Sequence, residues 1–559
     1  MPSMSGASQR SKATDGLAAM FLDPRERHTV TQVLAERSSR LGDRPFLVGE
    51  EGELTYREFS ERALTLAQGL VSLGIAPGET VLVMLPNVTN FVVLWAALAR
   101  IGAVQVPVNT AYRGGILEHI ISDSRARVII ADGAFLAAVA EAAARCPSLE
   151  HVVVHDAGDG DVNADLPEGL TNSRFDALAC ADAALPEPPA PSDLIAVMYT
   201  SGTTGPSKGA MITHAHAYVY AHNGHDRMQL DENDVYFAPL PLFHIGGQWA
   251  VVYAAMICGA AAVITRRFSV STFWQDAVRY RATASFLLGA MANFLRAQPP
   301  GEEERASRID RMLIVPLFPE VKAFGERFGV RVVTTYGSTE ANSPMIAAFD
   351  EPDWRRCGKV KEGLFEARIV DDDDEEVPDG TVGKLVVRPC LPGLVMAGYW
   401  GHPDWTAQAW RNLWLHTGDA MYRDEEGYFY FVDRKKDAIR RRGENISSVE
   451  VENEINSHPD VIECAVFPVR SQHTEDDVMA AVVLGPGSDL GYAALIAFLE
   501  PRMADFMIPR FVEFVAELPK TPTGKIQKFE LRARGRTPAT WDRDGDDDGI
   551  QVNQKEKTQ

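Results

Sequence analysis

The sequence predicts an α/β protein with a large N-terminal domain of packed sheets and helices and a small α+β domain at its C-terminal end. From about residue 25 to 430, helical stretches alternate with short apolar strands, which is the pattern of sheets covered by helices. The chain has 559 residues, 46% of them hydrophobic, so it can bury large cores. After Asp433 the pattern changes to a more compact series of strands and helices.

The first strongly apolar elements are a strand at 80–86, a helix at 91–103 and a strand that begins at Val104. Short β-rich runs predict further strands of the same kind at 127–132, 151–156 and 331–336. Residues 155–192 are rich in Asp, Gly, Pro and Ala, which predicts a long surface connection. No period of about 20 to 50 residues recurs, so a solenoid is excluded.

Residues 245–265 carry no charge and are long enough to span a bilayer. Glycines at 246, 247 and 259 interrupt this stretch, and the residues after Gly259 resemble a short buried strand. We therefore predict a buried helix followed by a core strand, and no transmembrane segment.

The second half of the chain begins with a hairpin at 366–389, whose turn carries six adjacent carboxylates at 371–376. Such a run favours a solvated loop tip over a metal site. A strand at 427–433 then leads into a strongly basic segment, followed by helices and strands. The predicted organisation is a flexible N-terminus (1–24), an N-terminal domain (25–433), a C-terminal domain (434–536) and an acidic disordered tail (537–559).

The charge balance limits the partners of the chain. Asp and Glu number 77 against 55 Lys and Arg, for a net charge of −22, which argues against nucleic acid and anionic membranes as partners. Six cysteines are scattered without a C-x-x-C pair, and the N-terminal residues lack the apolar core of a signal peptide. Both features predict reduced thiols and a cytoplasmic location.

The segment 199–209, YTSGTTGPSKG, follows an apolar strand and suits the binding of polyphosphate. Its glycines let backbone N–H groups approach an anion, its hydroxyls add donors, and Lys208 adds a positive charge. It is not a Walker A loop, because Ser207 and Gly209 flank the lysine. An ordinary polar linker is the alternative. The candidate phosphate-binding residues are Thr200, Ser201, Gly202, Thr203, Thr204, Gly205 and Lys208.

Four further motifs follow in order: TYGSTE at 335–340, LHTGD at 415–419, DRKKD at 433–437 with GEN at 443–445, and PKTPTGK at 519–525. With the phosphate loop, this order resembles the adenylate-forming superfamily, which includes acyl-CoA synthetases, luciferases and peptide-synthetase adenylation domains. The basic segment resembles the corresponding segment of the crotonobetaine/carnitine-CoA ligase-like branch. The resemblance implies an αβαβα-like N-terminal domain with a small β-barrel subdomain, and a mobile C-terminal lid.

The resemblance also implies an AMP-forming acid–thiol ligase. A carboxylic acid would attack the α-phosphate of ATP to give acyl-AMP and pyrophosphate, and the thiol of coenzyme A would then displace AMP. The implied cofactors and partners are ATP, Mg²⁺, coenzyme A and a small-molecule carboxylic acid, and a homodimer is left open. One alternative is a ligase that loads a carrier-protein thiol, and another is a degenerate nucleotide-binding homologue.

By the family's pattern, Tyr336 and Gly337 would contact adenine and Thr339 the α-phosphate, while Glu340 would hold Mg²⁺ and Asp419 the ribose hydroxyls. Each role has a structural alternative. Tyr336 could be a core aromatic at a strand end, Glu340 a charge at a helix N-terminus, and Asp419 a turn former.

The basic segment and the C-terminal loop supply the remaining implied roles. Arg434 would lie beside the ribose, Lys436 would be the hinge, and Gly443 and Glu444 would belong to the loop used for thioester formation. Lys525 would reach the carboxylate and α-phosphate during adenylation, and a solvated loop lysine is its alternative.

His244 is the last candidate catalytic residue, together with Lys208, Lys436 and Lys525. In acyl-CoA synthetases the matching histidine lies between the acyl pocket and the pantetheine tunnel. Leu242 and Phe243 precede it, which argues against a substrate with an α-amino group.

Only the segments that the resemblance implies as walls of the acyl pocket bear on the identity of the substrate acid. These segments, at 244–249, 287–293 and 338–345, are mostly apolar with small residues. They favour a hydrophobic acyl group over a charged one. The turn at 313–320 lacks the small residues usual in the family, so no adenine-binding role is assigned to it.

Overall fold

The computed structural model divides the chain into two compact units, residues 1–431 and 432–559, and each is described by itself. The structure describes residues 23–156, 166–180, 182–200, 207–434, 439–441, 444–446, 448–470, 476–503, 505, 507–520 and 526–545. Most of the predicted flexible N-terminus, 1–24, lies outside these residues. Within them, no helix has the length and apolar character needed to cross a membrane.

The first sheet of the N-terminal unit has eight strands in the order β20-β9-β8-β4-β3-β5-β6-β7. The central strands β3 and β5 pair in parallel and are fully buried, as their continuous apolar sequences require. At one end of the sheet, β9 pairs antiparallel with both β8 and β20. The strands predicted at 80–86, 127–132 and 151–156 are confirmed. The bounds are β3 (Thr80–Met84), β4 (Val104–Pro107), β5 (Val128–Asp132), β6 (His151–His155), β7 (Thr171–Arg174), β8 (Leu194–Thr200), β9 (Lys208–Thr213) and β20 (Gly398–Tyr399).

The second sheet has seven strands in the order β14-β13-β12-β10-β11-β1-β2. All pairs are parallel except β1 with β2. The bounds are β1 (Pro45–Gly49), β2 (Gly52–Thr55), β10 (Val235–Phe237), β11 (Ala261–Ile264), β12 (Ala284–Leu288), β13 (Arg311–Val315) and β14 (Arg331–Val333).

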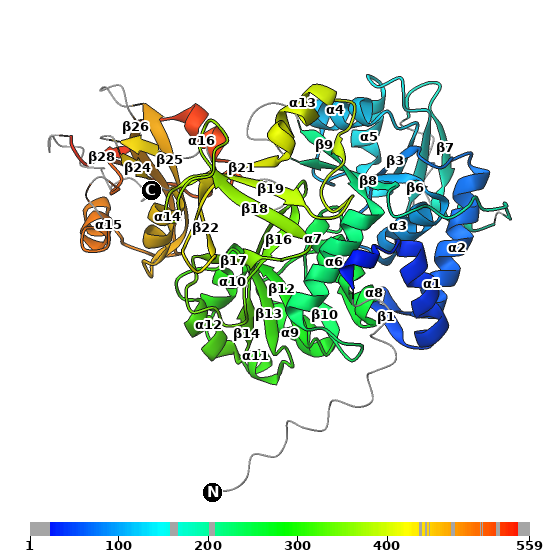
Figure 1. Ribbon diagram of the computed structural model, residues 1–559, viewed down its shortest axis with the longest axis horizontal. Coiled ribbons are helices and arrows are strands. Elements are labelled where there is room, and N and C mark those ends of the chain that lie inside the picture. Colours follow the sequence, from blue (N-terminus) through cyan, green and yellow to red (C-terminus); the bar gives the residue numbers. More distant parts are fainter. Residues whose placement is uncertain are drawn as a thin grey trace, which may run out of the picture. The chain divides into compact units, whose positions relative to one another are not determined.

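Helices fill the space between the two sheets and cover both outer faces, which confirms the αβαβα-like arrangement (Figure 1). The inner layer contains α1 (Val30–Leu41), α2 (Tyr56–Ser72), α3 (Thr89–Ile101), α6 (His214–Met228) and α8 (Ala254–Cys258). The outer layers contain α4 (Gly114–Ser124) and α5 (Leu136–Ala143) on the first sheet, and α9 (Phe273–Arg279), α10 (Gly289–Arg296) and α12 (Val321–Phe328) on the second.

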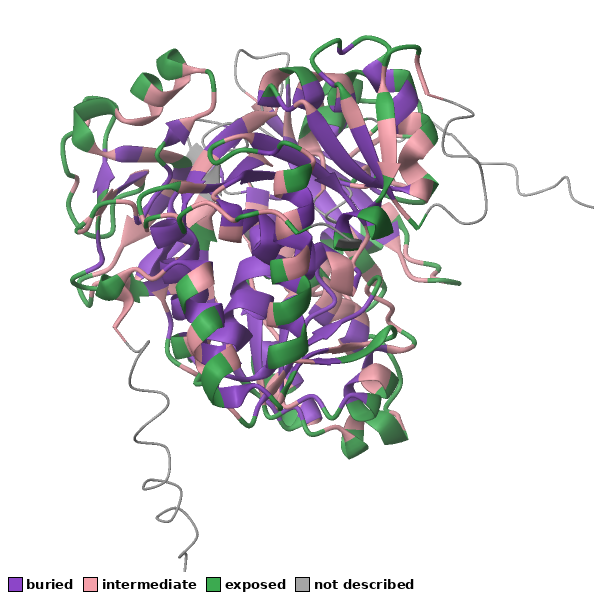
Figure 2. Ribbon diagram, turned by 90° about the vertical axis from the view of Figure 1, so that its right-hand side faces the viewer, coloured by how far each residue is buried: buried purple, intermediate pink, exposed green. Residues whose placement is uncertain are grey.

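N-terminal capping motifs in the sequence fix where two of these helices begin. Capping boxes formed by Thr29 with Gln32 and by Thr55 with Glu58 begin α1 and α2. The uncharged stretch at 245–265 forms α7 (Ile245–Gly247), the π-helical turn η5 (Gln248–Tyr253), α8 and β11. All residues of these elements are buried apart from Cys258 at the end of α8, so the predicted buried helix and core strand are confirmed. Figure 2 shows buried residues throughout the interior of the molecule and exposed residues mainly at its rim.

A third sheet of antiparallel pairs has the order β15-β16-β17-β22-β21-β19-β18. The predicted hairpin is confirmed as β18 with β19, and most of its acidic turn is exposed. Strand β18 also contacts β16 and β17, so the expected small β-barrel is a sheet that folds back on itself, with β15 and β18 at its ends. The bounds are β15 (Thr335–Ser338), β16 (Asn342–Ile346), β17 (Arg356–Val360), β18 (Phe365–Val370), β19 (Gly383–Pro389), β21 (Leu415–Arg423) and β22 (Phe429–Arg434), with α13 (Pro403–Ala409) nearby in sequence.

The C-terminal unit is α+β with its own apolar core. A four-stranded sheet has the order β25-β26-β27-β28, and β23 pairs with β24. The bounds are β23 (Ile439–Arg441), β24 (Glu444–Ile446), α14 (Ser448–Asn456), β25 (Val461–Arg470), β26 (Asp476–Leu484), α15 (Tyr492–Leu499), β27 (Phe511–Phe514), α16 (Lys528–Arg534) and β28 (Trp541–Asp542).

Three sequence predictions are corrected. The surface connection at 155–192 contains β7, which pairs with β6, and the short helix η4 (Phe175–Cys180). The single strand predicted at 331–336 is divided between β14 and β15, which belong to different sheets. Disorder does not hold for 537–545, because β28 pairs with β27 and Trp541 stacks on Tyr492, with ring centroids 5.6 Å apart.

Candidate active site

The segment whose sequence predicts phosphate binding begins and ends on two paired strands. Thr200 ends β8 and Lys208 begins β9, and the two residues are partners in the antiparallel ladder. Ser201, Gly202, Thr203, Thr204 and Gly205 lie outside the described residues. The ladder therefore places the two ends of the segment, Thr200 and Lys208, side by side.

Two aromatic rings contact the ammonium group of Lys208. Its Nζ lies 5.3 Å from the ring centroid of Tyr399 and 5.2 Å from that of Trp405. These distances are typical of cation–π interactions. The sequence analysis did not single out either aromatic residue. The adjacent aromatic residues of the Gly398-Tyr399-Trp400 run were the available signal, but no spacing linked them to Lys208.

Neighbouring residues fix the position of the Trp405 ring and of the C-terminal end of β8. The His402 ring stacks on Trp405 with centroids 3.7 Å apart, and His402 Nε2 lies 2.7 Å from Asp123 Oδ1. Tyr199 donates a hydrogen bond of 2.6 Å from its hydroxyl to Asp123 Oδ2. Burial and the Asp123 carboxylate raise the pKa of Tyr199, so this hydroxyl stays a donor.

Glu340, the last residue of the TYGSTE motif, is hydrogen-bonded to the end of β8. Thr200 Oγ1 donates a hydrogen bond of 3.0 Å to Glu340 Oε1, and the Tyr399 hydroxyl lies 3.5 Å from the same oxygen. Glu340 lies in the turn between β15 and β16, so the alternative of a charge at a helix N-terminus is wrong. Thr339 precedes it and is 7% exposed.

Tyr336 and Asp419 form a second contact between distant motifs. The Tyr336 hydroxyl donates a hydrogen bond of 2.5 Å to Asp419 Oδ2, and the two residues are 8% and 6% exposed. Burial first, and then the Asp419 charge, raise the pKa of Tyr336. Asp419 lies within β21, and Tyr336 belongs to the main core cluster. Tyr336 is therefore a core aromatic whose hydroxyl fixes the Asp419 carboxylate.

Gly337 lies where the β15–β16 hairpin is too tight for a side chain. A Cβ at this position would come within 2.5 Å of the Asn342 carbonyl oxygen and 3.1 Å of Ser343 Cα. Glycine is thus required by the close approach of two strands, whatever its role toward a nucleotide.

His244 is the N-cap residue of α7. Its Nδ1 accepts a hydrogen bond of 3.2 Å from the Gly246 N–H, and its carbonyl accepts one of 3.1 Å from the Gln248 N–H. The π-helical turn η5 starts at Gln248, and such turns often lie at functional sites.

The remaining candidates belong to the C-terminal unit. The backbone of Arg434 ends β22 and that of Glu444 begins β24. Lys436, Gly443 and Lys525 lie outside the described residues. Of the described candidates, Thr200 bonds Glu340 in the β15–β16 turn, and Tyr336, on the strand before that turn, bonds Asp419.

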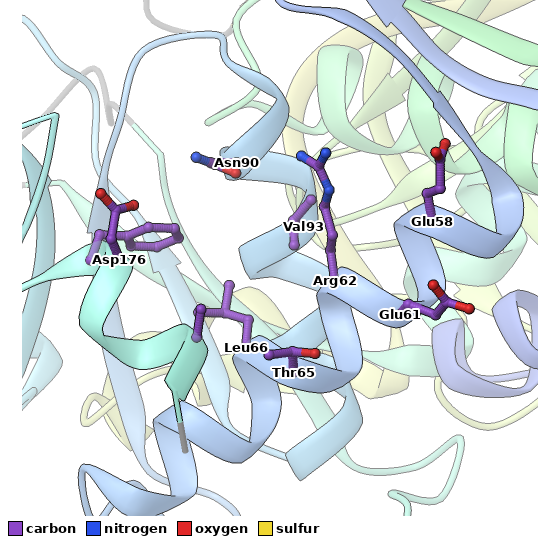
Figure 3. Close-up of a pocket in the computed structure, with 10 residues that line it drawn as sticks. Glu58, Glu61, Arg62, Thr65, Leu66, Asn90, Val93 and Asp176 are labelled. Carbon is purple, nitrogen blue, oxygen red and sulfur yellow. The ribbon is translucent and has the colours of Figure 1, made fainter. Parts of the chain in front are cut away.

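A cavity of about 440 Å³ lies elsewhere in the N-terminal unit, against α2, α3 and η4 (Figure 3). Glu58, Glu61, Arg62 and Asp176 supply its charges over an apolar floor that includes Leu66. None of its lining residues belongs to the five motifs.

The comparisons with known proteins agree with this geometry. The family model described as AMP-binding enzyme matches residues 34–400, and that of the AMP-binding enzyme C-terminal domain matches 450–525. A crotonobetaine/carnitine–CoA ligase from Salmonella choleraesuis (strain SC-B67) is 33% identical over 505 residues, which cover 88% of this chain and 96% of the relative.

Solved structures give the same result. An anthranilate CoA ligase, AuaEII, in complex with anthranoyl-AMP matches with a TM-score of 0.82 and 26% identity, over 91% of this chain and 97% of that one. ATP-bound MatB from Rhodopseudomonas palustris matches with a TM-score of 0.79 and 27% identity, over 91% and 99%. The chain belongs to the family of AMP-binding enzymes.

Proposed function

We propose that the chain is an ATP-dependent carboxylic acid–CoA ligase that works through an acyl-adenylate. The observation that carries this proposal is the convergence of three distant motifs on one turn, through Thr200 with Glu340 and Tyr336 with Asp419. Relatives and neighbours named as CoA ligases, one of them bound to anthranoyl-AMP, support the reaction class.

The nucleotide-binding roles follow from the positions of the described residues. Lys208 and the segment between β8 and β9 would bind the outer phosphates of ATP, since that segment ends on the ammonium group of Lys208, which forms no ion pair with any described residue. Asp419 would accept hydrogen bonds from the ribose hydroxyls, with its carboxylate oriented by Tyr336. Thr339 would contact the α-phosphate, next to the attacking carboxylate, where alignment and charge stabilisation lower the barrier.

Glu340 is the residue that would hold Mg²⁺. The chain offers an oxygen donor set there, from the Glu340 carboxylate and the Thr200 hydroxyl, and Mg²⁺ is often held by one or two carboxylates together with substrate phosphates. Among the described residues no cluster of three or more acidic, His or Cys side chains could hold a metal alone. Bound Mg²⁺ would neutralise part of the phosphate charge.

The C-terminal unit would complete the reaction. Lys525 would serve adenylation, and Lys436, Arg434, Gly443 and Glu444 would belong to the hinge and the thioester-forming surface of a mobile lid. His244 would separate the acyl pocket from the path of the thiol. We place the enzyme in the cytoplasm, because the five cysteines whose thiols are described are free.

The test is a panel of carboxylic acids supplied with ATP and either coenzyme A or a carrier protein. We expect pyrophosphate release with accepted acids, and a CoA thioester detectable by mass spectrometry. Release of AMP with acyl transfer only to the carrier protein would favour the carrier-loading alternative. Absence of pyrophosphate release with every acid, while ATP binds, would indicate a degenerate homologue.

A further inference from the structure

A buried arginine without a carboxylate partner lies in the last turn of α6. Arg227 is 6% exposed, and it forms no ion pair with any residue that the structure describes. Its Nη2 donates a hydrogen bond of 2.7 Å to Ser343 Oγ, while its Nε is buried without a hydrogen-bond partner. Burial lowers the pKa of Arg227 to about 10. A desolvated guanidinium of this kind is costly unless an anion or an acceptor meets it.

The acid next to Arg227 in sequence does not supply that anion. Asp226 Oδ2 lies 2.7 Å from Lys361 Nζ, and the Asp226 side chain is 55% exposed. Lys361 also donates a hydrogen bond of 3.0 Å to Asn223 Oδ1. The Asp226 carboxylate is thus paired with Lys361 on the solvent side. It raises the pKa of Arg227 through its charge but forms no ion pair with it, and neither does any other carboxylate among the described residues.

Arg227 lies directly behind the nucleotide motif. Ser343 is on β16, which contacts α6 (Figure 1), and its hydroxyl lies 2.8 Å from that of Thr335, the residue before Tyr336. Gly337 approaches Ser343 so closely that an added Cβ would lie 3.1 Å from Ser343 Cα. One hydrogen-bonding side chain therefore separates the guanidinium from the strand that carries the proposed adenylation residues.

Near Arg227 lie a second unsatisfied polar group, the hydroxyl of Tyr236, and several apolar side chains. The Tyr236 hydroxyl is buried without a hydrogen-bond partner in the described chain, and Tyr236 and Tyr220 both lie close enough to Arg227 to influence its pKa. Tyr220 contacts Trp249 edge to face, with centroids 6.3 Å apart, and both tyrosines pack in one cluster with Leu288. Trp249 and Leu288 belong to two of the expected walls of the acyl pocket. Unsatisfied donors among apolar walls are typical of a site for a ligand with an oxygen acceptor.

We propose that Arg227 is the specificity-determining residue for the acid, and that it binds a second carboxylate at the far end of the acyl chain. The substrate class is therefore a dicarboxylic acid, rather than the purely hydrophobic acid that the wall sequences favour. Ser343 is a positioning residue that orients the guanidinium fork, which suits a planar carboxylate. This inference rests on the proposed ligase function.

The experiment compares acids of equal chain length that end in a methyl group, a carboxylate, an amide or a trimethylammonium group. Pyrophosphate release is measured with the wild type, Arg227→Met, Ser343→Ala and the control Asp226→Asn. We expect the wild type to prefer the dicarboxylic acid. Arg227→Met should lower kcat/KM for that acid by at least about 30-fold, the loss expected when one partner of a buried charge pair is removed, and should spare the methyl-terminated acid. Asp226→Asn should keep the wild-type order of preference.

Folding is monitored by thermal unfolding, because Arg227→Met changes a buried site. Ser343→Ala keeps the charge and should lose a smaller part of the preference for the dicarboxylic acid, so it tests the same site independently. A wild type that prefers the methyl, amide or trimethylammonium acid overturns this proposal and leaves the ligase function standing. A chain that releases pyrophosphate with no acid overturns both.

Discussion

At the scale of single residues, the contacts of Lys208 explain how the lysine that we propose binds phosphate can be held before its ligand arrives. The ring faces of Tyr399 and Trp405 attract the ammonium group without neutralising it. A carboxylate in their place would compete with the phosphates, and within the described chain Lys208 forms no ion pair. Glu340, the nearby acid, is instead bonded to Thr200.

Trp405→Ala should therefore weaken ATP binding modestly. A cation–π contact at a partly exposed site contributes about 0.5–1 kcal/mol, so we expect KM for ATP to rise about two- to fivefold while kcat changes little. Trp405→Phe should restore most of the affinity, because it keeps a ring face. The measurement is ATP–pyrophosphate exchange with an accepted acid.

The matched control for this prediction is Trp414→Ala. Trp414 contacts the guanidinium groups of Arg368 and Arg388 rather than Lys208, so its removal should leave KM for ATP unchanged. An unchanged KM in Trp405→Ala would contradict the role of the ring, and an equal rise in both alanine variants would point to a general loss of structure.

At the scale of elements, α6 is unusual because it buries histidines as well as Arg227. His214 and His216 are fully buried. Burial lowers the pKa of His214 to about 4 and that of His216 to about 3, and the Asp193 charge offsets only part of the effect at His214. Both rings are therefore neutral in the folded protein at neutral pH.

This burial predicts a loss of stability in acid. The unfolded chain binds protons at these histidines below about pH 6.5, whereas the folded chain does not until the pH nears the lowered pKa values. Their contribution is thus fully present above pH 6.5 and is lost as the pH falls toward 4. Between pH 6.5 and 5 the loss is about 2 kcal/mol per histidine. Thermal unfolding at pH 7 and pH 5 measures it.

The variant His216→Asn separates this effect from that of the carboxylates. It should be less stable than the wild type at pH 7, yet lose less stability between pH 7 and pH 5. The same pH dependence in both proteins would show that His216 is protonated in the folded state or that other groups dominate.

Elements with strong apolar periodicity could be predicted from the sequence, and the others needed tertiary information. The strand at Thr80–Met84 and the helix at Thr89–Ile101 carry their own pattern. The strand Thr171–Arg174 is polar throughout and is fixed only by pairing with β6. The β-branched run RVVTTY at 331–336 contains no Gly or Pro that would reveal a change of sheet. In the site, motifs identified Glu340 and Asp419, whereas the contact of Lys208 with Trp405 joins segments that no local pattern connects.

At the scale of the whole molecule, the candidate residues are divided between two units with separate cores. Lys208, Glu340 and Asp419 lie in the N-terminal unit, and Lys525 in the C-terminal unit. The segment 521–525 is outside the described residues, but its flanks are joined by a β-bridge between Lys520 and Ile526. Such a division is consistent with our proposal that the C-terminal domain swivels and presents a different surface in each half-reaction.

Lys525→Ala should consequently separate the two half-reactions. Removing a charge that stabilises the adenylation transition state should lower acyl-AMP formation by at least about 100-fold, whereas thioester formation from supplied acyl-AMP and coenzyme A should be largely retained. Lys520→Ala is the matched control, because Lys520 is engaged in an ion pair of 2.7 Å with Glu463 and such pairs contribute little. Pyrophosphate release measures the first half and thioester formation the second. Equal loss of both halves in Lys525→Ala would refute the division of roles, since a lysine needed only for adenylation has no reason to slow attack by the thiol.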